Sequence, residues 1–535
     1  MTDNKRANLV FLLLLLAYLV YAAFYIARTS WVVGGERYFI LNDDAMISMR
    51  YARNLADGAG LVWNPGGERV EGFTNPLWVA YMAVWHLFPI PARLMSLPIQ
   101  LTGLVFLAIN LFIVRRIAFR LSGSHLVTLL AVALTAFYGP LNNWGLLGME
   151  VSVLVLLVSL AAWSAIQAFD SGRFSWQPYL WLGLGTLVRF DMAVPYLAVW
   201  LVFMLFDPAN RRRHLTHGLG LLVLLLAAQT GLRLAYYGEP LPNTYTLKMT
   251  GLPAWVRIGN GLAVFLKLIE RIGWPLALLP FALLFYRRDR ATILLAALLA
   301  AQSAYSIYVG GDAWEHKGGA NRYISLAMPA FFILFTQAAA DFWRFIGERA
   351  AQFRWPPARA LANLGLVVFI LAGMVQFNAV EDVRSLRKWI LTARPEFTVG
   401  NEEYVRIALA LNKITTPDAT LAVVTAGTIP YFTDRPCIDL LGKNDPVIAA
   451  LDAHLPGGLW TKLTAFRPGH AKWDYAYSIG KLQPDVVVQL WDEPDVARAL
   501  MANDYAILEI DGLTFSVRRD SPRILWEAAD AIIQP

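Results

Sequence analysis

Long apolar stretches alternate with short polar ones through roughly the first 380 residues of the chain. A helix that crosses a bilayer needs roughly 20 consecutive, mainly apolar residues, and about eleven stretches come close to that length. They are 9–27, 94–114, 125–140, 150–168, 178–188, 192–206, 217–235, 273–286, 291–309, 323–341 and 359–379. The pattern therefore predicts a polytopic α-helical membrane protein with about eleven transmembrane helices.

Two apolar stretches do not fit a simple span. Residues 178–206 are too long for one span and barely long enough for two, so we interpret them as a hairpin whose turn is Arg189-Phe190-Asp191. Charges in such a turn are costly in lipid unless they face a cavity. The stretch Leu77–Phe88 is too short for a span and contains Trp78 and Trp85. We therefore expect a helix that lies along the membrane interface.

The pattern changes after residue 380, where the apolar runs become short and alternate with polar residues. The predicted strands are 421–425, 485–490, 505–510 and 513–517. Asp511-Gly512 separates the last two and predicts a tight hairpin. About 155 residues suffice for one small α/β domain. We therefore divide the chain into a transmembrane module, 1–380, and a C-terminal domain, 381–535.

The positions of the basic residues orient the predicted spans. Lysine and arginine concentrate in the cytoplasmic loops of membrane proteins, and the basic loops here all fall on one side if the N-terminus is cytoplasmic. These loop residues are Lys5, Arg6, Arg115, Arg116, Arg120, Arg173, Arg211, Arg212, Arg213, Arg287, Arg288, Arg290, Arg344, Arg349 and Arg354. We expect a multi-pass protein of the inner (plasma) membrane whose C-terminal domain is extracytoplasmic.

Composition agrees with a membrane protein and excludes other classes. The chain is 57% hydrophobic and 16% charged, whereas soluble proteins carry about 25% charged residues. Much of the net charge of +7 belongs to the orienting loops, so it does not indicate nucleic-acid binding. A single cysteine, Cys437, excludes an intramolecular disulfide framework. The sequence contains no zinc, Walker or dinucleotide-binding motif.

Most of the unusual polar residues fall in the predicted outer loops. Two adjacent aspartates, Asp43 and Asp44, follow the first span and open a long polar segment. A transferase on this face has no nucleotide sugar to draw on, so its donor must be a lipid-carried sugar such as a polyprenyl-phosphate sugar. In that reaction a carboxylate takes the proton of the acceptor hydroxyl, and cations stabilise the leaving phosphate.

These requirements assign roles to particular residues. Asp44, with Asp43 beside it, is the candidate catalytic base. The candidate cations for the donor phosphate are Lys248, His316, Arg322 and Arg189. The candidates for binding the sugar or the acceptor are Glu71, Asn75, Glu150, Asp191, Asn243, Tyr245 and Asp312. The spacing requires no cofactor or metal, and a divalent cation on Asp43, Asp44 and Asp312 is an alternative.

The same residues have structural interpretations. Asp43 or Asp44 could cap a helix over Ala45–Ala56, and this could coexist with catalysis. Glu71 could form a salt bridge with Arg50 or Arg53 that holds the first outer loop together. Other structural roles are a helix cap for Glu150, a salt bridge between Arg189 and Asp191, and a solvated loop for His316.

The run from Asp43 to Trp78 carries a resemblance to a known family. This run, DDAMISMRYARNLADGAGLVWNPGGERVEGFTNPLW, resembles the first outer loop of GT-C-fold, lipid-phosphate-sugar-dependent glycosyltransferases. It is most similar to the branch with the mycobacterial terminal arabinofuranosyltransferase and the Pseudomonas pilin arabinosyltransferase. Similarity to that branch also covers YYGEPLPNTYTLK, the segment VGGD…RY and AGTIPYFTDRPCIDLLGKNDPVIA.

The resemblance implies both a fold and an activity. It implies a GT-C module with interface helices in the first outer loop and a C-terminal domain that is a candidate for binding the acceptor. It also implies decaprenyl-phosphate arabinofuranose, or a related polyprenyl-phosphate sugar, as the donor. Asp43 and Asp44 stand at the acidic motif that this family uses in catalysis.

The predicted function is transfer of a sugar, D-arabinofuranose by resemblance, to a hydroxyl of a cell-envelope glycan or surface protein. The expected partners are the polyprenyl-phosphate donor, the glycan or glycoprotein acceptor and the lipid bilayer. Two alternatives remain open. One is a GT-C transferase for another lipid-linked sugar, such as mannose, glucose or aminoarabinose. The other is a lipid-sugar flippase, which would place charges within the spans.

Overall fold

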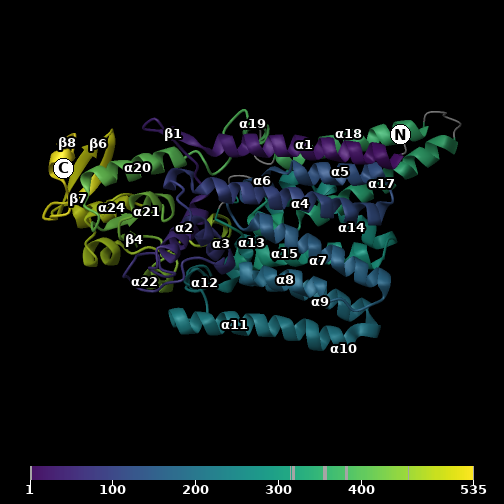
Figure 1. Cartoon of the computed structure of the whole chain (residues 1–535), viewed down its shortest axis with the longest axis horizontal. Coiled ribbons are helices and arrows are strands. Elements are labelled where there is room, and N and C mark those ends of the chain that lie inside the picture. The colour runs from purple at the N-terminus through teal and green to yellow at the C-terminus, as the bar shows by residue number, and fades with distance from the viewer. Residues whose placement is uncertain are drawn as a thin grey trace. The chain divides into compact units, whose positions relative to one another are not determined.

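The computed structural model describes residues 3–313, 315, 320–352, 358–379, 383–455 and 457–533, and most of them are helical (Figure 1). The long helices are α1 (Asp3–Thr29), α4 (Ser96–Ser122), α5 (His125–Ala136), α7 (Val151–Ser171), α8 (Gln177–Val188), α9 (Ala193–Phe206), α11 (Gly220–Tyr237), α13 (Ala254–Ile272), α14 (Trp274–Tyr286), α15 (Arg290–Val309), α17 (Met328–Gln352) and α18 (Ala358–Asn378).

Contacts within the chain divide it into two compact units, which we describe separately. Unit 1 comprises Met1–Arg28, Gln100–Ala228 and Ile258–Glu396, and unit 2 comprises Thr29–Ile99, Gln229–Arg257 and Phe397–Pro535. Unit 2 therefore joins the first outer loop to most of the tail. The expected boundary at residue 380 stays a prediction.

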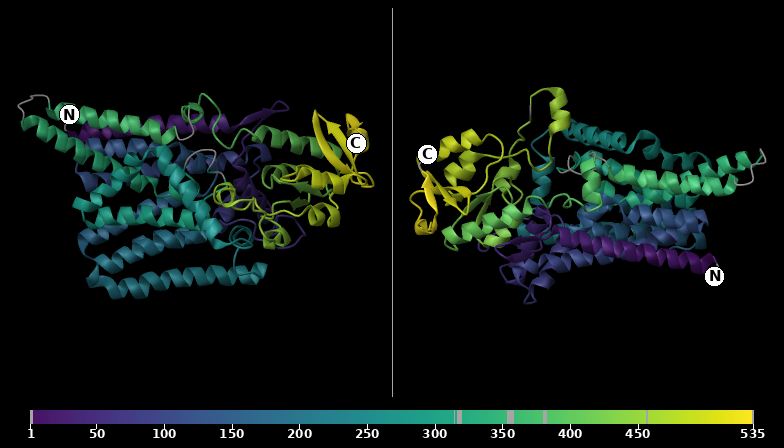
Figure 2. Two further views of the ribbon diagram at one scale, coloured as in Figure 1. Left: turned by 180° about the vertical axis from the view of Figure 1, so that it is seen from behind. Right: turned by 90° about the horizontal axis from the view of Figure 1, so that it is seen from above.

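Unit 1 is a bundle of helices that run side by side (Figures 1 and 2). Helix α7 packs against α8, α9 packs against α15, and α17 contacts α5, α14, α15 and α18. Stacked and edge-on phenylalanine rings fill the contact between α17 and α18, where Phe335 meets both Phe369 and Phe377. Short helices α6 (Gly139–Leu146), α16 (Arg322–Ser325) and α19 (Val383–Trp389) also belong to this unit.

Every predicted span overlaps at least one helix of the structure. Among the described residues, 6 helices are long and apolar enough to cross a membrane, and two bent helix pairs raise this number to 8. The total of about eleven crossings stays a prediction. The stretch 178–206 forms the expected hairpin, α8 and α9. Helix α13 was not predicted, because Arg257, Lys267, Glu270 and Arg271 interrupt its apolar pattern.

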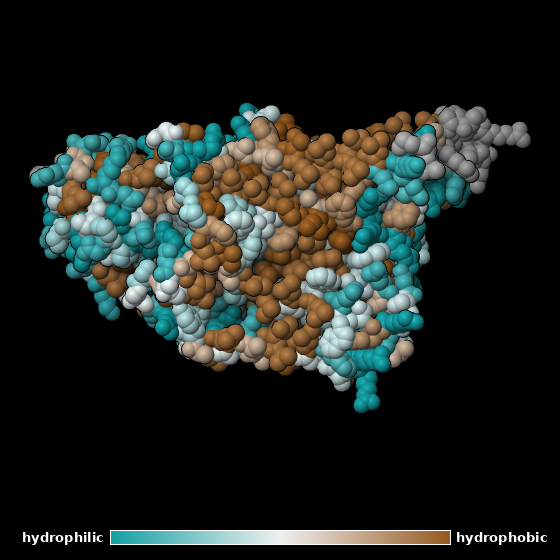
Figure 3. Space-filling model, viewed as in Figure 1, coloured by the Kyte–Doolittle hydropathy of each residue, from teal (hydrophilic) through white to brown (hydrophobic). Residues whose placement is uncertain are grey.

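The exposed faces of these helices are apolar. On α1, Leu16 is 58% exposed and Val20 is 62% exposed, and on α11 Leu232 is 72% exposed. Figure 3 shows apolar side chains gathered over the helices of unit 1. Burying such surface in lipid removes it from water, which a soluble protein would achieve in its core. The chain is therefore a membrane protein.

Unit 2 contains a six-stranded mixed sheet in the order β4-β3-β5-β7-β6-β8. Its strands are β3 (Leu421–Val423), β4 (Cys437–Asp439), β5 (Val486–Val487), β6 (Tyr505–Ile510), β7 (Leu513–Arg518) and β8 (Ala531–Ile533). The four predicted strands are present, and β4 and β8 were not predicted. Asp511-Gly512 closes the β6–β7 hairpin, in which Ile510 faces Leu513.

The remaining elements of unit 2 come from all three of its chain segments. They are β1 (Trp31–Val33), β2 (Glu36–Tyr38), α2 (Asp43–Ala56), α3 (Pro76–His86), α12 (Asn243–Met249), α20 (Asn401–Ile414), α21 (Thr428–Thr433), α22 (Pro446–Ala450), α23 (Leu459–Ala465) and α24 (Pro494–Met501). Helix α3 matches the short helix expected at Leu77–Phe88, and it packs against α2.

Candidate active site

The two aspartates lie at the start of α2. Asn42 caps this helix, because its side-chain oxygen accepts the backbone N–H of Asp44 at 3.0 Å. The proposed capping by Asp43 or Asp44 is therefore wrong, since the residue before them does it. Successive positions on a helix point about 100° apart, so the two carboxylates meet different partners.

Asp43 is bound to the backbone of the tail. Its carboxylate accepts N–H groups from Thr428 at 2.7 Å and Gly427 at 3.3 Å. A Cβ on Gly427 would lie 2.0 Å from the Asp43 carbonyl oxygen, so only glycine allows this approach. Burial raises the pKa of Asp43, against the lowering effects of Lys443 and the Thr428 N–H. These bonds fix the side chain in place.

Asp44 forms an ion pair with Lys443. The Lys443 Nζ lies 2.7 Å from the Asp44 Oδ1, and the two side chains are 11% and 18% exposed. Burial alone would lower the pKa of Lys443, but the carboxylates of Asp44 and Asp43 outweigh this effect and raise it. Lys443 is therefore a protonated cation that touches the predicted catalytic carboxylate.

A polar loop after β4 holds Lys443. The buried Asp439 carboxylate accepts the N–H groups of Leu441 and Asn444 at 3.0 and 2.9 Å. From α12, the Asn243 amide donates to the carbonyl oxygens of Gly442 and Lys443 at 2.9 and 3.0 Å. Asn243, predicted to bind sugar or acceptor, thus positions the backbone that carries Lys443.

Lys248 and His470 lie near this ion pair. Gly469, at φ +77°, leaves room for Lys248, whose Cε would lie 3.0 Å from a Cβ there. Burial, followed by the positive charge of Lys443, lowers the pKa of His470 to about 3, so the imidazole is neutral near pH 7. Asp44 and Lys248 also act on the charge of His470. Unit 2 thus gathers the two aspartates, two lysines and a neutral histidine.

Arg50 ties the first outer loop to the tail within unit 2. This fully buried guanidinium donates to the Asn64 side-chain oxygen at 3.0 Å and to the Arg435 carbonyl oxygen at 2.8 Å. It also donates to the carbonyl oxygens of Trp63 and Pro430. These bonds hold α2 against the segment that carries Gly427 and Lys443.

The other sequence candidates in unit 2 have structural partners. Glu71 forms a two-point ion pair with Arg233, and not with Arg50 or Arg53 as the alternative proposed. Asn75 accepts a hydrogen bond from the Ser48 hydroxyl at 3.0 Å. Tyr245 is 40% exposed on α12. Their predicted contacts with sugar or acceptor stay predictions.

A second cluster of charges lies in unit 1. Arg189 pairs with Glu150 at 2.6 Å and with Asp191 at 2.7 Å, so the predicted salt bridge at the hairpin turn is present. Glu150 occupies the cap position of α7, but its side chain makes no capping bond and turns to Arg189 instead. Arg322 pairs with Asp312 at 2.8 Å. Both predicted phosphate-binding arginines of this unit are thus occupied by carboxylates.

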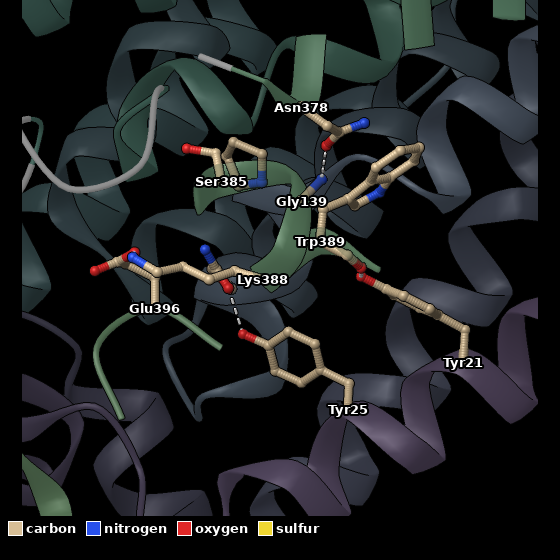
Figure 4. A pocket seen from close by; sticks show the side chains of 10 residues that line it. Tyr21, Tyr25, Gly139, Asn378, Ser385, Lys388, Trp389 and Glu396 are labelled. Atoms are coloured by element: carbon tan, nitrogen blue, oxygen red, sulfur yellow. Dashed lines mark hydrogen bonds and ion pairs between the residues drawn. The ribbon is translucent and has the colours of Figure 1, made fainter. Parts of the chain in front are cut away.

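The two small pockets found in unit 1 hold little more than water. The pocket beside Arg189 and Arg322 has a volume of about 10 Å³. Another pocket has a volume of about 30 Å³, and Figure 4 shows Tyr25 of α1, Lys388 and Glu396 in its lining. There the Tyr25 hydroxyl donates to the Asn143 side chain, and Lys388 pairs with Glu396. A water molecule needs at least about 10–15 Å³ of such volume, so neither pocket could take a sugar.

Two further predictions concern His316 as a phosphate ligand and a divalent cation bound to the aspartates. His316 lies outside the described residues. Among the described residues, no group of three or more His, Cys, Asp or Glu could hold a metal ion. The alternative cation site would use Asp43, Asp44 and Asp312. Their carboxylates bond to the Thr428 backbone N–H, to Lys443 and to Arg322, in that order.

Sequence reasoning did not find Lys443 or His470. The run IDLLGKNDPVIA is part of the resemblance to the arabinosyltransferase branch, but no local pattern links its lysine to an aspartate 399 residues earlier. A lone lysine between a buried strand and Asn-Asp was the one available signal. It indicates a turn as readily as a site.

Comparison with known proteins covers both sequence and structure. The domain of unknown function DUF8728 matches residues 393–523. A terminal β-(1→2)-arabinofuranosyltransferase of Corynebacterium glutamicum is 28% identical over 240 residues, which span 40% of this chain and 34% of that relative. The Mycobacterium tuberculosis protein of the same name is 28% identical over 227 residues, 40% of this chain and 35% of that relative. The matches thus span about a third of these relatives' length.

Structural similarity extends over nearly the whole chain. ArnT from Cupriavidus metallidurans bound to undecaprenyl phosphate aligns with a TM-score of 0.57 and 14% identity, covering 97% of this chain and 99% of ArnT. The oligosaccharyltransferase of Archaeoglobus fulgidus aligns with a TM-score of 0.52 and 12% identity, covering 96% and 76% of the two chains. Both neighbours are GT-C glycosyltransferases, so this chain has the GT-C fold and resembles the terminal arabinofuranosyltransferases in sequence.

Proposed function

We propose that this chain is a glycosyltransferase that moves D-arabinofuranose from a polyprenyl phosphate to a hydroxyl of a cell-envelope glycan or surface protein. The reaction takes place on the extracytoplasmic side of the membrane. The observation that carries this proposal is the ion pair of Asp44 and Lys443, which sets a candidate base against a candidate phosphate ligand.

Asp44 is the base in this proposal. Its carboxylate pairs with Lys443 and remains 18% exposed, whereas the Asp43 carboxylate is held by two backbone N–H groups. Asp44 takes the proton of the acceptor hydroxyl, and the acceptor oxygen attacks the anomeric carbon. The bond between that carbon and the phosphate oxygen breaks, and the lipid phosphate leaves with the electron pair. Asp43 positions the start of α2.

Lys443 and Lys248 are the phosphate ligands in this proposal. A phosphate that enters beside Asp44 attracts the Lys443 ammonium, and this frees the carboxylate to accept a proton. Lys248 was predicted for this role from the sequence and lies in the same unit, near His470. Arg189 and Arg322 have carboxylate partners already, which favours a structural role for both.

The relatives support the donor and the sugar. The Cupriavidus ArnT structure contains undecaprenyl phosphate, a polyprenyl phosphate. The sequence relatives bear the name of arabinofuranosyltransferases. Transfer of another lipid-linked sugar is the second candidate, because ArnT matches this chain along its whole length. The positive-inside pattern of the loops supports the extracytoplasmic side.

A reconstituted transfer assay tests the proposal. The purified chain receives synthetic polyprenyl-phosphate arabinofuranose, or the mannose, glucose or aminoarabinose analogue, with an arabinofuranose oligosaccharide as acceptor. We expect transfer from the arabinose donor and a loss of about 10²–10⁴-fold in Asp44→Asn, the usual contribution of a general base. Asp57→Asn removes an exposed carboxylate at the other end of α2 and should transfer normally.

Three outcomes would contradict the proposal or part of it. Full activity in both Asp43→Asn and Asp44→Asn would exclude the aspartate pair from the chemistry. Transfer from the mannose donor alone would keep the mechanism but overturn the choice of sugar. Movement of the donor across the bilayer without formation of a glycosidic bond would favour a flippase.

A further inference from the structure

A large cavity opens in unit 2 beside His470. Its volume is about 670 Å³, within the range of about 300–1,000 Å³ that is typical of small-molecule sites. All of its lining residues belong to the tail. Five of them carry rings: His454, Phe466, His470, Trp473 and Trp491. The residues assigned above to the base and to the donor phosphate, Asp44, Lys443 and Lys248, are not among the residues that line it.

Hydrogen bonds and ring contacts fix the aromatic lining. His454 stacks on Trp473 with 4.0 Å between ring centroids. The Trp491 indole N–H donates to the His470 carbonyl oxygen at 3.1 Å, and its backbone N–H donates to the Tyr475 hydroxyl at 2.9 Å. Rings that are held in this way offer flat apolar faces at little entropic cost. The C–H face of a sugar ring packs well on such a face.

The charges of the lining suit a neutral polyhydroxylated ligand better than a phosphate. Arg467 is the cation of this lining, against the carboxylates of Asp492 and Glu493. With a pKa of about 3, His470 adds no positive charge near pH 7. Two exposed carboxylates repel a phosphate, whereas they accept hydrogen bonds from sugar hydroxyls. The donor phosphate therefore belongs elsewhere, at the lysines.

His470 connects the cavity to the candidate base. Its side chain lines the cavity and also lies within electrostatic reach of Asp44, Lys443 and Lys248. We infer that the cavity binds the end of a neutral acceptor glycan and presents its hydroxyl to Asp44. This inference rests on the proposed transferase function and adds the place where the acceptor binds.

Direct binding tests the inference without any transfer. Full-length protein in nanodiscs, without donor, is titrated calorimetrically with a synthetic arabinofuranose tetrasaccharide. We expect wild type and Asp44→Asn to bind alike, and Trp491→Ala to bind about tenfold more weakly because a stacking face is lost. Inorganic phosphate should not compete with the tetrasaccharide, because the lining carries more negative than positive charge.

A matched variant controls for the loss of a tryptophan. Trp526 is partly buried like Trp491 and lies in the same unit, but it does not line the cavity. Trp526→Ala should bind the tetrasaccharide as wild type does. Glu493→Gln changes an exposed lining residue with little effect on folding, and it should weaken binding severalfold.

The outcomes separate this inference from the proposed function. Tetrasaccharide binding that depends on Trp491 and Glu493 supports the cavity even if arabinose transfer fails in the reconstituted assay. If wild type does not bind the tetrasaccharide, or if Trp491→Ala and Glu493→Gln bind as tightly as Trp526→Ala, the inference is wrong. Displacement of the tetrasaccharide by phosphate would also overturn it, because the cavity would then be an anion site.

Discussion

Two clusters of charged residues in this chain both pair basic side chains with carboxylates, but they serve different roles. In unit 1, Arg189 is 9% exposed and lies between Glu150, 1% exposed, and Asp191. In unit 2, Asp44 and Lys443 are 18% and 11% exposed, and a cavity opens beside the neighbouring His470. A charge that is enclosed by its partners contributes to the fold, whereas a charge left partly open can exchange its partner for a substrate.

The largest predicted effect concerns the stability of unit 1. Arg189→Met removes the cation from two buried carboxylates, which leaves uncompensated charge in the interior. We expect a loss of about 3–5 kcal/mol in the free energy of unfolding. Thermal or denaturant unfolding in detergent measures it. The double variant Arg189→Met with Glu150→Gln should regain part of the loss.

The variant Arg189→Met also tests whether the two clusters differ in role. The fraction of Arg189→Met protein that remains folded should keep a donor KM close to that of wild type. Wild-type stability combined with a donor KM raised tenfold or more would instead make Arg189 a phosphate ligand, as the sequence first predicted.

The second prediction concerns the cation of unit 2. Lys443→Met should lower kcat/KM for transfer about 100-fold, because a charged hydrogen bond to the leaving phosphate is lost. Lys443→Arg keeps the charge and should retain more activity. Lys481→Met removes an exposed lysine of the same unit and is the control. Equal rates for Lys443→Met and Lys481→Met would remove Lys443 from the site.

Local patterns predicted the helices and the tail hairpin, but not the completed site. The helices at the predicted spans and the Asp511-Gly512 turn depend on neighbours in the sequence, and both are present. The partner of Asp44 depends on tertiary folding, since Lys443 is 399 residues away. Helix α13 and the short strand β4 were missed because charges or brevity hide their periodicity. Arg189 was found for its charge, which does not distinguish a phosphate ligand from a salt bridge.

A third prediction concerns the pH dependence of stability, because His470 is buried beside cations. Its pKa is about 3 in the folded protein and about 6.5 when unfolded, so between these values only the unfolded state binds the proton. Stability should therefore fall as pH falls through this window, by up to about 1.4 kcal/mol per pH unit, and level off below pH 3. His470→Gln should lose this part of the slope.

Unfolding temperatures at pH 7 and pH 5 check the His470 prediction. The drop between the two should be larger in wild type than in His470→Gln. Carboxylates that titrate near pH 4 affect both proteins equally, so the difference between the two drops isolates the histidine. Identical drops in the two proteins would mean that His470 is protonated in the folded state as readily as in the unfolded chain.

The smallest predicted effect separates positioning from direct contact in unit 2. Asn243 was predicted to touch sugar or acceptor, but its amide bonds to the carbonyl oxygens of Gly442 and Lys443. Asn243→Ala should loosen the Lys443 loop and raise the donor KM about tenfold, with the acceptor KM unchanged. A tenfold change corresponds to about the free energy that one to two neutral hydrogen bonds contribute. Thr250→Ala, at the exposed end of α12, is the control and should leave both constants unchanged. A rise in the acceptor KM alone would mean that Asn243 contacts the acceptor, and the site in unit 2 would then extend beyond the lysine loop.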